Sequence, residues 1–206
     1  MLQISTIQPS TLELLISLQK VEVLKSTRLV GGTALALQLG HRLSIDLDFF
    51  GQVEGDSATI ADCLRDEGFD IIMNENTKNI HIFTINGVKT DIVNYKYSWI
   101  DESIEDGGIK LAGLKDIAAM KMAAITNRGS KKDFIDFYFL LNHFSLKEII
   151  DFYLGKYPDA SAFLACKSLV YFADADIQVM PKMLVPTDWE EVKKTIITKV
   201  KQISLL

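Results

Sequence analysis

Two aspartates, Asp46 and Asp48, stand one residue apart in a segment that alternates polar and apolar residues from Ser44 to Phe49. Because side chains on a β-strand change face at every residue, this alternation predicts a strand with both carboxylates on one side. Carboxylates held side by side repel each other, and burying them without a partner is costly. A divalent cation that binds both would relieve the repulsion, as in Mg²⁺ sites that also hold substrate phosphates.

A glycine pair lies upstream of the acidic segment and opens the apolar stretch Thr33–Leu39. We expect the backbone N–H groups of Gly31, Gly32 and Thr33 to stand at a helix start, where they can approach phosphates. A lone Gly-Gly is usually a turn, and a lone Asp-x-Asp is usually a surface or capping feature. The order of strand, Gly-Gly turn, helix and acidic strand together predicts a nucleotide site.

These motifs resemble a known family. Val30-Gly31-Gly32, a thirteen-residue gap and Asp46-Leu47-Asp48-Phe49 are similar to the signature of the DNA polymerase β-type nucleotidyltransferase superfamily. The longer stretch 31–50 resembles the AbiEii/AbiGii toxin branch, which includes the MenT-type toxins, and so does a second block from Met120 to Tyr138. The resemblance implies an enzyme that uses Mg²⁺ (or Mn²⁺) to move a nucleoside monophosphate from an NTP to an acceptor.

In this superfamily a third carboxylate from a later strand usually joins the first two. Asp91 is the best candidate, because an acid inside the otherwise apolar segment Val88–Tyr95 needs a partner. It would be a metal ligand beside Asp46 and Asp48, or would accept the proton of the acceptor hydroxyl. The alternative is an exposed edge-strand residue paired with Lys89 or another neighbour.

The resemblance assigns further residues to the nucleotide. Ser44 would hydrogen-bond a phosphate or orient a carboxylate, although it is equally an ordinary strand hydroxyl. Lys121 lies mid-helix among apolar residues, where a lysine needs an anion or an exit to solvent, and would bind the triphosphate. Asp133 would contact the site, but three residues after Ser130 it is also a useful helix-capping acid. Arg42 would reach a phosphate.

Composition limits the class of protein. With 206 residues, 48% of them hydrophobic and 24% charged, the chain suits one globular domain or two small lobes. Cys63 and Cys166 form no metal or disulfide pattern. Apolar runs such as Phe137–Leu141 are too short to span a bilayer, and the N-terminus has no secretory pattern, so we expect a cytoplasmic protein without membrane contact. His41, His81 and His143 form no recognisable constellation with a serine or cysteine nucleophile.

The charge is distributed unevenly. The net charge of −5 argues against indiscriminate binding of nucleic acid. Between Lys110 and Lys132, however, six basic residues accompany the single acid Asp116, which gives a local charge of +5. This stretch is either a set of solvated helix faces or a basic surface that faces triphosphate or RNA.

The expected elements indicate an α+β fold. A nucleotidyltransferase-type lobe with a mixed sheet and helices is predicted for residues 1–106. A helical lobe that completes the NTP site and binds the acceptor is predicted for residues 107–206, with the site in the groove between lobes. The polar and glycine residues 105–108 mark the boundary. The predicted helices are Ser10–Lys25, Ser57–Glu67, Leu114–Asn127, Ser130–Asn142, Asp159–Ala173 and two that begin with capping boxes at Ser145 and Thr187; the predicted strands include Thr27–Val30, Phe69–Met73, and Ile80–Ile85 paired with Val88–Tyr95 through an Asn86-Gly87 turn.

The resemblance implies the toxin of a toxin–antitoxin or phage-defence pair, with a cognate antitoxin as partner. In MenT-like relatives the acceptor is the 3′ end of tRNA, so tRNA is the expected acceptor here. Two other functions stay open: the same chemistry on a protein or a small molecule such as an aminoglycoside, and a non-catalytic nucleotide-binding module. The presence of all three aspartates, Asp46, Asp48 and Asp91, argues against the last of these.

Overall fold

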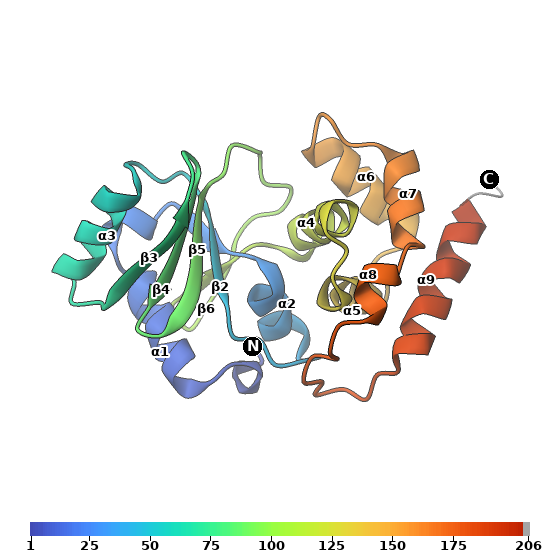
Figure 1. Ribbon diagram of the computed structural model, residues 1–206, viewed down its shortest axis with the longest axis horizontal. Coiled ribbons are helices and arrows are strands. Elements are labelled where there is room, and N and C mark those ends of the chain that lie inside the picture. The colour runs from blue at the N-terminus through green and yellow to red at the C-terminus, as the bar shows by residue number, and fades with distance from the viewer. Residues whose placement is uncertain (204–206) are drawn as a thin grey trace. The chain divides into compact units, whose positions relative to one another are not determined.

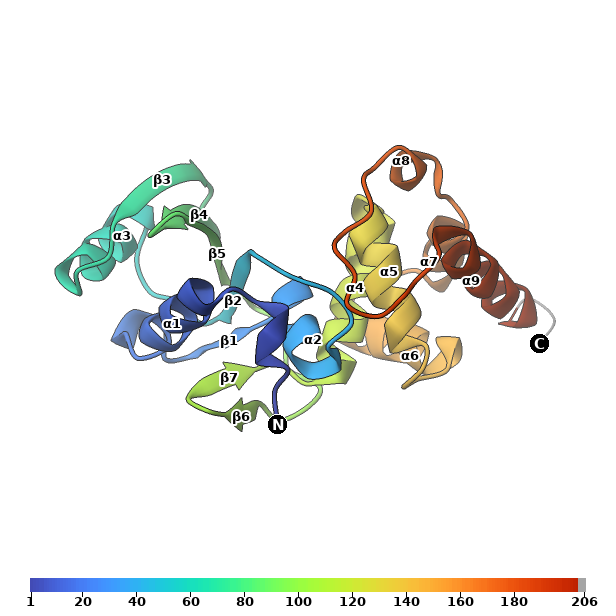
Figure 2. The same cartoon turned by 90° about the horizontal axis from the view of Figure 1, so that it is seen from below.

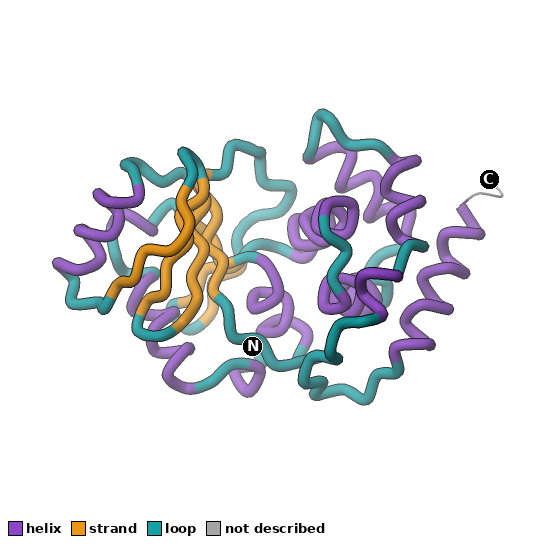
Figure 3. Tube along the Cα trace, viewed as in Figure 1, coloured by secondary structure: helices purple, strands orange, loops and turns teal. Residues whose placement is uncertain are grey.

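The computed structural model describes residues 1–203 and, for Asn76, the main chain alone. The chain forms two compact units. The first comprises Met1–Gln38, Leu43–Lys96 and Glu102–Ala112 and contains the strands, drawn in orange in Figure 3. The second comprises Leu39–Arg42, Tyr97–Asp101 and the chain from Gly113 onward, in which the described elements are helices (Figures 1 and 3).

Within residues 1–203 the first unit holds a seven-stranded sheet in the order β3-β4-β5-β2-β1-β7-β6. The strands are β1 Thr27–Leu29, β2 Leu47–Gly51, β3 Ile71–Asn76, β4 Ile80–Ile85, β5 Val88–Asn94, β6 Ile104–Asp106 and β7 Ile109–Leu111. The pairs β2–β5 and β1–β7 are parallel, whereas the other neighbours are antiparallel. The predicted α+β fold, with a mixed sheet followed by helices, is therefore confirmed.

The helices of the first unit are α1 Pro9–Leu18, α2 Gly31–Leu39 and α3 Ser57–Asp66, with short 3₁₀ turns at Ile4–Thr6 and Glu22–Leu24. Figures 1 and 2 show α1 and α3 on the same face of the sheet. The predicted start of the first helix at a Ser10 capping box is wrong. The helix begins at Pro9, whose fixed φ suits the first helical position, and it ends at Leu18 rather than Lys25.

The second unit contains α4 Leu114–Asn127, α5 Lys131–Leu140, α6 Leu146–Lys156, α7 Ala162–Leu169, α8 Ala173–Asp176 and α9 Trp189–Ile203. The capping box at Ser145 is confirmed, because its side chain and that of Glu148 bond reciprocally to the helix start. The box predicted at Thr187 is wrong by one residue. Asp188 caps α9 by accepting a hydrogen bond from the Glu191 N–H at 3.0 Å.

The predicted acidic strand begins later than its alternation indicates. Leu47 and Phe49 are fully buried as expected, but Ile45 is 64% exposed and lies before β2. The Ser44 N–H donates to the Thr6 carbonyl at 2.9 Å, so this part of the chain is paired outside the sheet. Strand periodicity therefore applies only from Leu47 onward, and Asp46 lies in the segment that leads into the strand.

Two glycine turns join strands in the first unit. Asn86 and Gly87 take positive φ angles of 47° and 80°, as the tight turn of the predicted hairpin requires. Gly107 and Gly108, expected to mark a boundary between lobes, instead form the turn between β6 and β7.

Among residues 1–203, no helix has both the length and the apolar character that crossing a membrane requires.

A buried ion pair links three parts of the second unit. Lys156 Nζ on α6 lies 2.6 Å from Asp116 Oδ1 on α4, and both side chains are fully buried. Asp116 also accepts hydrogen bonds from the N–H groups of Ile100 and Asp101, while Lys156 donates to the Ser98 carbonyl at 2.7 Å. The pair therefore fixes the segment that leads from the sheet to α4.

We predict that Lys156→Met lowers the free energy of unfolding of the helical unit by about 3–5 kcal/mol, because the Asp116 charge would stay buried without its cation. The two tryptophans of the chain, Trp99 and Trp189, both lie in this unit, so fluorescence during urea unfolding measures the loss. Lys147→Met is the control, since it removes the exposed pair with Asp151 at 2.8 Å. Equal losses of stability in the two variants would contradict the conclusion that the buried Lys156–Asp116 pair stabilises this unit.

Candidate functional site

The glycine turn and the acidic strand are in direct contact. Gly31 begins α2 with φ +69°, a backbone conformation that L side chains rarely adopt. A Cβ atom at Gly31 would lie 2.1 Å from Asp48 Oδ2. The main chains also pair here, because the Val30 N–H donates to the Asp48 carbonyl at 2.8 Å. Only glycine therefore lets the start of α2 approach this carboxylate.

The start of α2 is also tied to the segment before β2. Thr33 Oγ1 donates to the main-chain oxygen of Asp46 and is hydrogen-bonded to Ser44 Oγ at 2.8 Å. Thr33 and Ser44 are both buried. The predicted residues Gly31, Thr33, Ser44, Asp46 and Asp48 thus come together around the first turn of one helix, and Gly32 lies in that same turn.

Asp91 lies beside Asp48 across the parallel β2–β5 pair, where the two residues occupy paired register positions. Strand β5 is flanked by β4 and β2, so the alternative of an edge-strand position for Asp91 is wrong. The pairing with Lys89, which was part of that alternative, is nevertheless present: Lys89 Nζ lies 3.0 Å from Asp91 Oδ1 and 3.1 Å from Oδ2. Residues 89 and 91 share one face of β5, because they are two positions apart.

Lys89 was not predicted as a site residue, yet its ammonium interacts electrostatically with all three predicted metal ligands. Burial acts to lower the pKa of Lys89, but its hydrogen bond with Asp91 and the negative charges of Asp91, Asp46 and Asp48 outweigh burial and raise that pKa. A lysine two residues before an acid on a predicted strand is the sequence signal for this contact. The ammonium of Lys89 is thus the counter-ion of Asp46, Asp48 and Asp91, which together form the acidic face.

The acidic face fits a divalent cation in part. Among residues 1–203, no three histidine, cysteine, aspartate or glutamate side chains are grouped as a ready-made metal site. However, Asp91 Oδ1 is buried and, although close to Lys89, accepts no well-directed hydrogen bond. Mg²⁺ is commonly held by one or two carboxylates together with substrate phosphates, so a closed cage of protein ligands is not required. Asp46, Asp48 and Asp91 supply the donor type that such an ion prefers.

The other three predicted nucleotide-binding residues belong to a buried charge cluster in the second unit. Lys121 Nζ lies 2.6 Å from Asp136 Oδ2 and 3.1 Å from Asp133 Oδ1. Arg42 makes two hydrogen bonds with Asp136, at 2.7 and 2.8 Å, and His41 makes a third at 2.8 Å. Asp136, three residues after Asp133 on α5, is the centre of this cluster.

The Lys121 ammonium is paired with the carboxylates of Asp133 and Asp136 inside the protein. It is 5% exposed, so the alternative that its ammonium reaches solvent is wrong. Burial acts to lower the pKa of Lys121, but the charges of Asp136 and Asp133 prevail and raise it. Burial acts to raise the pKa of Asp136, and the charges of Lys121 and Arg42 hold it well below its usual value. Direct contact of Lys121, Arg42 and Asp133 with nucleotide stays a prediction.

The basic stretch from Lys110 to Lys132 is not a continuous cationic surface. Lys121 and Lys131 are buried, and Lys131 donates to the main-chain oxygens of Asp176 and Gln178. Lys115 pairs with Asp101 at 2.8 Å. The local charge of +5 is therefore largely used within the second unit.

One histidine, His81, is hydrogen-bonded to a serine hydroxyl. His81 Nδ1 lies 2.6 Å from Ser57 Oγ at the start of α3. His81 is buried, which lowers its pKa, and the nearby charge of Asp56 opposes that shift only in part. A neutral, enclosed imidazole bonded to the first residue of a helix fits a contact that anchors α3 on β4.

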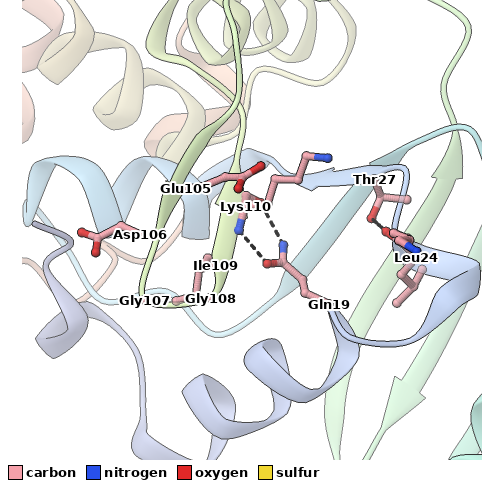
Figure 4. Close-up of a pocket in the computed structure, with 10 residues that line it drawn as sticks. Gln19, Leu24, Thr27, Glu105, Asp106, Gly107, Gly108, Ile109 and Lys110 are labelled. Atoms are coloured by element: carbon pink, nitrogen blue, oxygen red, sulfur yellow. Dashed lines mark hydrogen bonds between the residues drawn. The ribbon is translucent and has the colours of Figure 1, made fainter.

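The linings of two cavities, one in each unit, include neither the glycine turn nor the three aspartates. One of about 400 Å³ is in the first unit, where the Gln19 side chain bonds the main chain of Lys110 in both directions, at 2.6 and 2.8 Å (Figure 4). It reaches Thr27 at the start of β1, whereas the glycine turn follows the end of that strand. The other, of about 500 Å³, lies between α4 and α7 in the second unit. Neither is lined by a predicted site residue.

Sequence comparison gives the family. Residues 13–111, which contain the glycine turn and all three aspartates, match the family model described as nucleotidyl transferase AbiEii toxin of type IV toxin–antitoxin systems. The chain is also 39% identical over 180 residues to an uncharacterized protein of Aquifex aeolicus (strain VF5), with 84% of this chain and 86% of that protein covered.

Solved structures show the same fold at low sequence identity. A protein of H. pylori described as a nucleotidyltransferase is 16% identical, with a TM-score of 0.60 and 95% of each chain covered. The nucleotidyltransferase toxin MenT4 of Mycobacterium tuberculosis H37Rv is 15% identical, with a TM-score of 0.53 and coverage of 91% of this chain and 83% of that one. The resemblance seen in the motifs is thus confirmed: the chain belongs to the AbiEii toxin family and is a nucleotidyltransferase.

Proposed function

We propose that this nucleotidyltransferase uses Mg²⁺ or Mn²⁺ to transfer a nucleoside monophosphate from an NTP to the 3′ end of tRNA, as the toxin of a toxin–antitoxin or phage-defence pair. The observation that carries the catalytic part is the apposition of the Gly31 turn to Asp48, with Asp91 beside it in register. A phosphate-binding helix start and two carboxylates then share one small region of the first unit.

The start of α2 would hold the triphosphate. The N–H groups of Gly31, Gly32 and Thr33 belong to the first turn of the helix, whose partial positive charge favours anions. Ser44, bonded to Thr33, would hydrogen-bond a phosphate or orient the carboxylate of Asp46. Arg42, Lys121 and Asp133 are also proposed to contact the nucleotide.

Asp46, Asp48 and Asp91 would hold the divalent cation. When bound, such an ion neutralises phosphate charge and lowers the pKa of an attacking hydroxyl. In the transfer, the acceptor hydroxyl oxygen bonds to the α-phosphorus of the NTP. The bond between the α-phosphorus and the oxygen that bridges it to the β-phosphorus breaks, and pyrophosphate leaves. Asp91, whose Oδ1 lacks a well-directed hydrogen bond, would either complete the metal site or accept the hydroxyl proton.

The proposed tRNA acceptor and the proposed antitoxin partner are inferred from the family resemblance. MenT-like resemblance favours tRNA, and the toxin description favours a cognate antitoxin protein. One observation favours the alternative of a protein or small-molecule acceptor: the basic stretch 110–132 is largely paired or buried and the chain carries a net charge of −5. Both acceptor classes use the same catalytic residues.

We predict that each α-³²P-labelled NTP, incubated with Mg²⁺, total tRNA and the wild-type protein, reveals label on tRNA for at least one base. The doubly substituted Asp46→Ala/Asp48→Ala protein should retain less than about one hundredth of that rate, because it lacks two metal ligands. The measurement is label retained on tRNA after gel electrophoresis, with EDTA as a second control.

The same assay separates the alternatives. Label on protein or on a small molecule, lost in the double variant, would support nucleotidyl transfer by these aspartates but show that the acceptor is not tRNA. Label on tRNA at equal rates in both proteins would contradict the assignment of Asp46 and Asp48.

We also predict that Gly31→Ala abolishes transfer and destabilises the protein, because its Cβ would displace the Asp48 carboxylate. Gly68→Ala is the matched control: Gly68 also has a positive φ, of 88°, but nothing lies within 4 Å of an added Cβ. That control should show only the backbone cost of about 1–2 kcal/mol in urea unfolding, with transfer unchanged. If Gly31→Ala stayed as active as Gly68→Ala, the role of the turn would be disproved.

A further inference from the structure

Lys89 occupies the acidic face in the way a bound cation would. Its Nζ lies within 3.1 Å of both oxygens of Asp91, the residue that pairs in register with Asp48. The charges of Asp46 and Asp48 also act on this ammonium. One lysine thus serves three carboxylates that otherwise repel one another.

Lys89 is exposed enough for its ammonium to move away from the carboxylates into solvent. Its side chain is 50% exposed, whereas that of Asp91 is 22% exposed. An ammonium on a flexible stem at a half-exposed position forms a weak ion pair, which costs little to break. The buried cations of the second unit, such as Lys121 and Lys156, have no comparable access to solvent.

We propose that Lys89 is a built-in competitor of the divalent cation: its ammonium neutralises the carboxylates in the metal-free enzyme and must withdraw before the ion binds. This inference rests on the proposed role of Asp46, Asp48 and Asp91 as metal ligands. Lys89 is therefore a positioning residue, which keeps the carboxylates on one face together and weakens metal binding when no nucleotide is present. The withdrawn ammonium would remain near the face where the triphosphate binds.

The test measures the dissociation constant of Mn²⁺ alone for the full chain, by the electron paramagnetic resonance signal of free Mn²⁺. Lys89→Met and Lys89→Gln should bind Mn²⁺ about fivefold more tightly than wild type, since the competing charge is gone. Lys89→Arg, which keeps a cation, should stay near wild type. Lys78→Met, in the exposed turn between β3 and β4, controls for loss of a distant lysine.

Asp48→Asn separates this inference from the proposed function. If Asp48→Asn weakens Mn²⁺ binding while both neutral Lys89 variants keep the wild-type dissociation constant, the competitor role is overturned and the metal site stands. If Asp48→Asn also leaves Mn²⁺ binding unchanged, the metal assignment itself fails and the inference falls with it. Circular dichroism of the metal-free variants checks that they are folded, and Lys89→Gln retains a polar side chain in case Lys89→Met does not fold.

Discussion

Mutual repulsion of carboxylates is the constraint on which the first unit depends. Asp48 and Asp91 are paired across two neighbouring parallel strands, and Asp46 precedes one of them by a single residue. Such an arrangement costs free energy unless positive charge or hydrogen-bond donors stand nearby. Lys89 meets that requirement from the same strand as Asp91. Under the proposed function, a bound cation would relieve the repulsion that remains among these carboxylates.

The glycine turn extends the same constraint to the backbone. Gly31 must hold a positive φ and leave room for Asp48 Oδ2, so the helix start and the carboxylate can lie this close only with glycine at this position. Thr33 adds a side-chain link from the same turn to the main chain of Asp46. The N–H groups proposed to bind phosphate and the oxygens proposed to bind metal thus lie close together before any substrate binds, which is the arrangement that electrostatic catalysis needs.

Local sequence patterns predicted the parts of the fold that local physics determines. The Asn86-Gly87 hairpin and the Ser145 capping box depend on residues a few positions apart, and both are present. The exposure of Ile45 could not be predicted, because it depends on a hydrogen bond between Ser44 and the distant Thr6. Likewise, the partner of Arg42 lies 94 residues away in Asp136, a pairing that periodicity cannot reveal. Motif spacing predicted candidate site residues and strand proximity predicted the Lys89–Asp91 pair, whereas the partners of Lys121 and Arg42 required the structure.

The cluster around Asp136 changes what a nucleotide would have to do in the second unit. Lys121 is buried between two carboxylates, and losing one partner of a buried ion pair costs about 3–5 kcal/mol. A triphosphate that took Lys121 would have to replace those contacts with at least equal ones. The same Asp136 also holds His41 and Arg42, which directly precede the segment of Ser44 and Asp46. Lys121 therefore has a structural task in the free protein, the neutralisation of Asp133 and Asp136, whether or not it also contacts nucleotide.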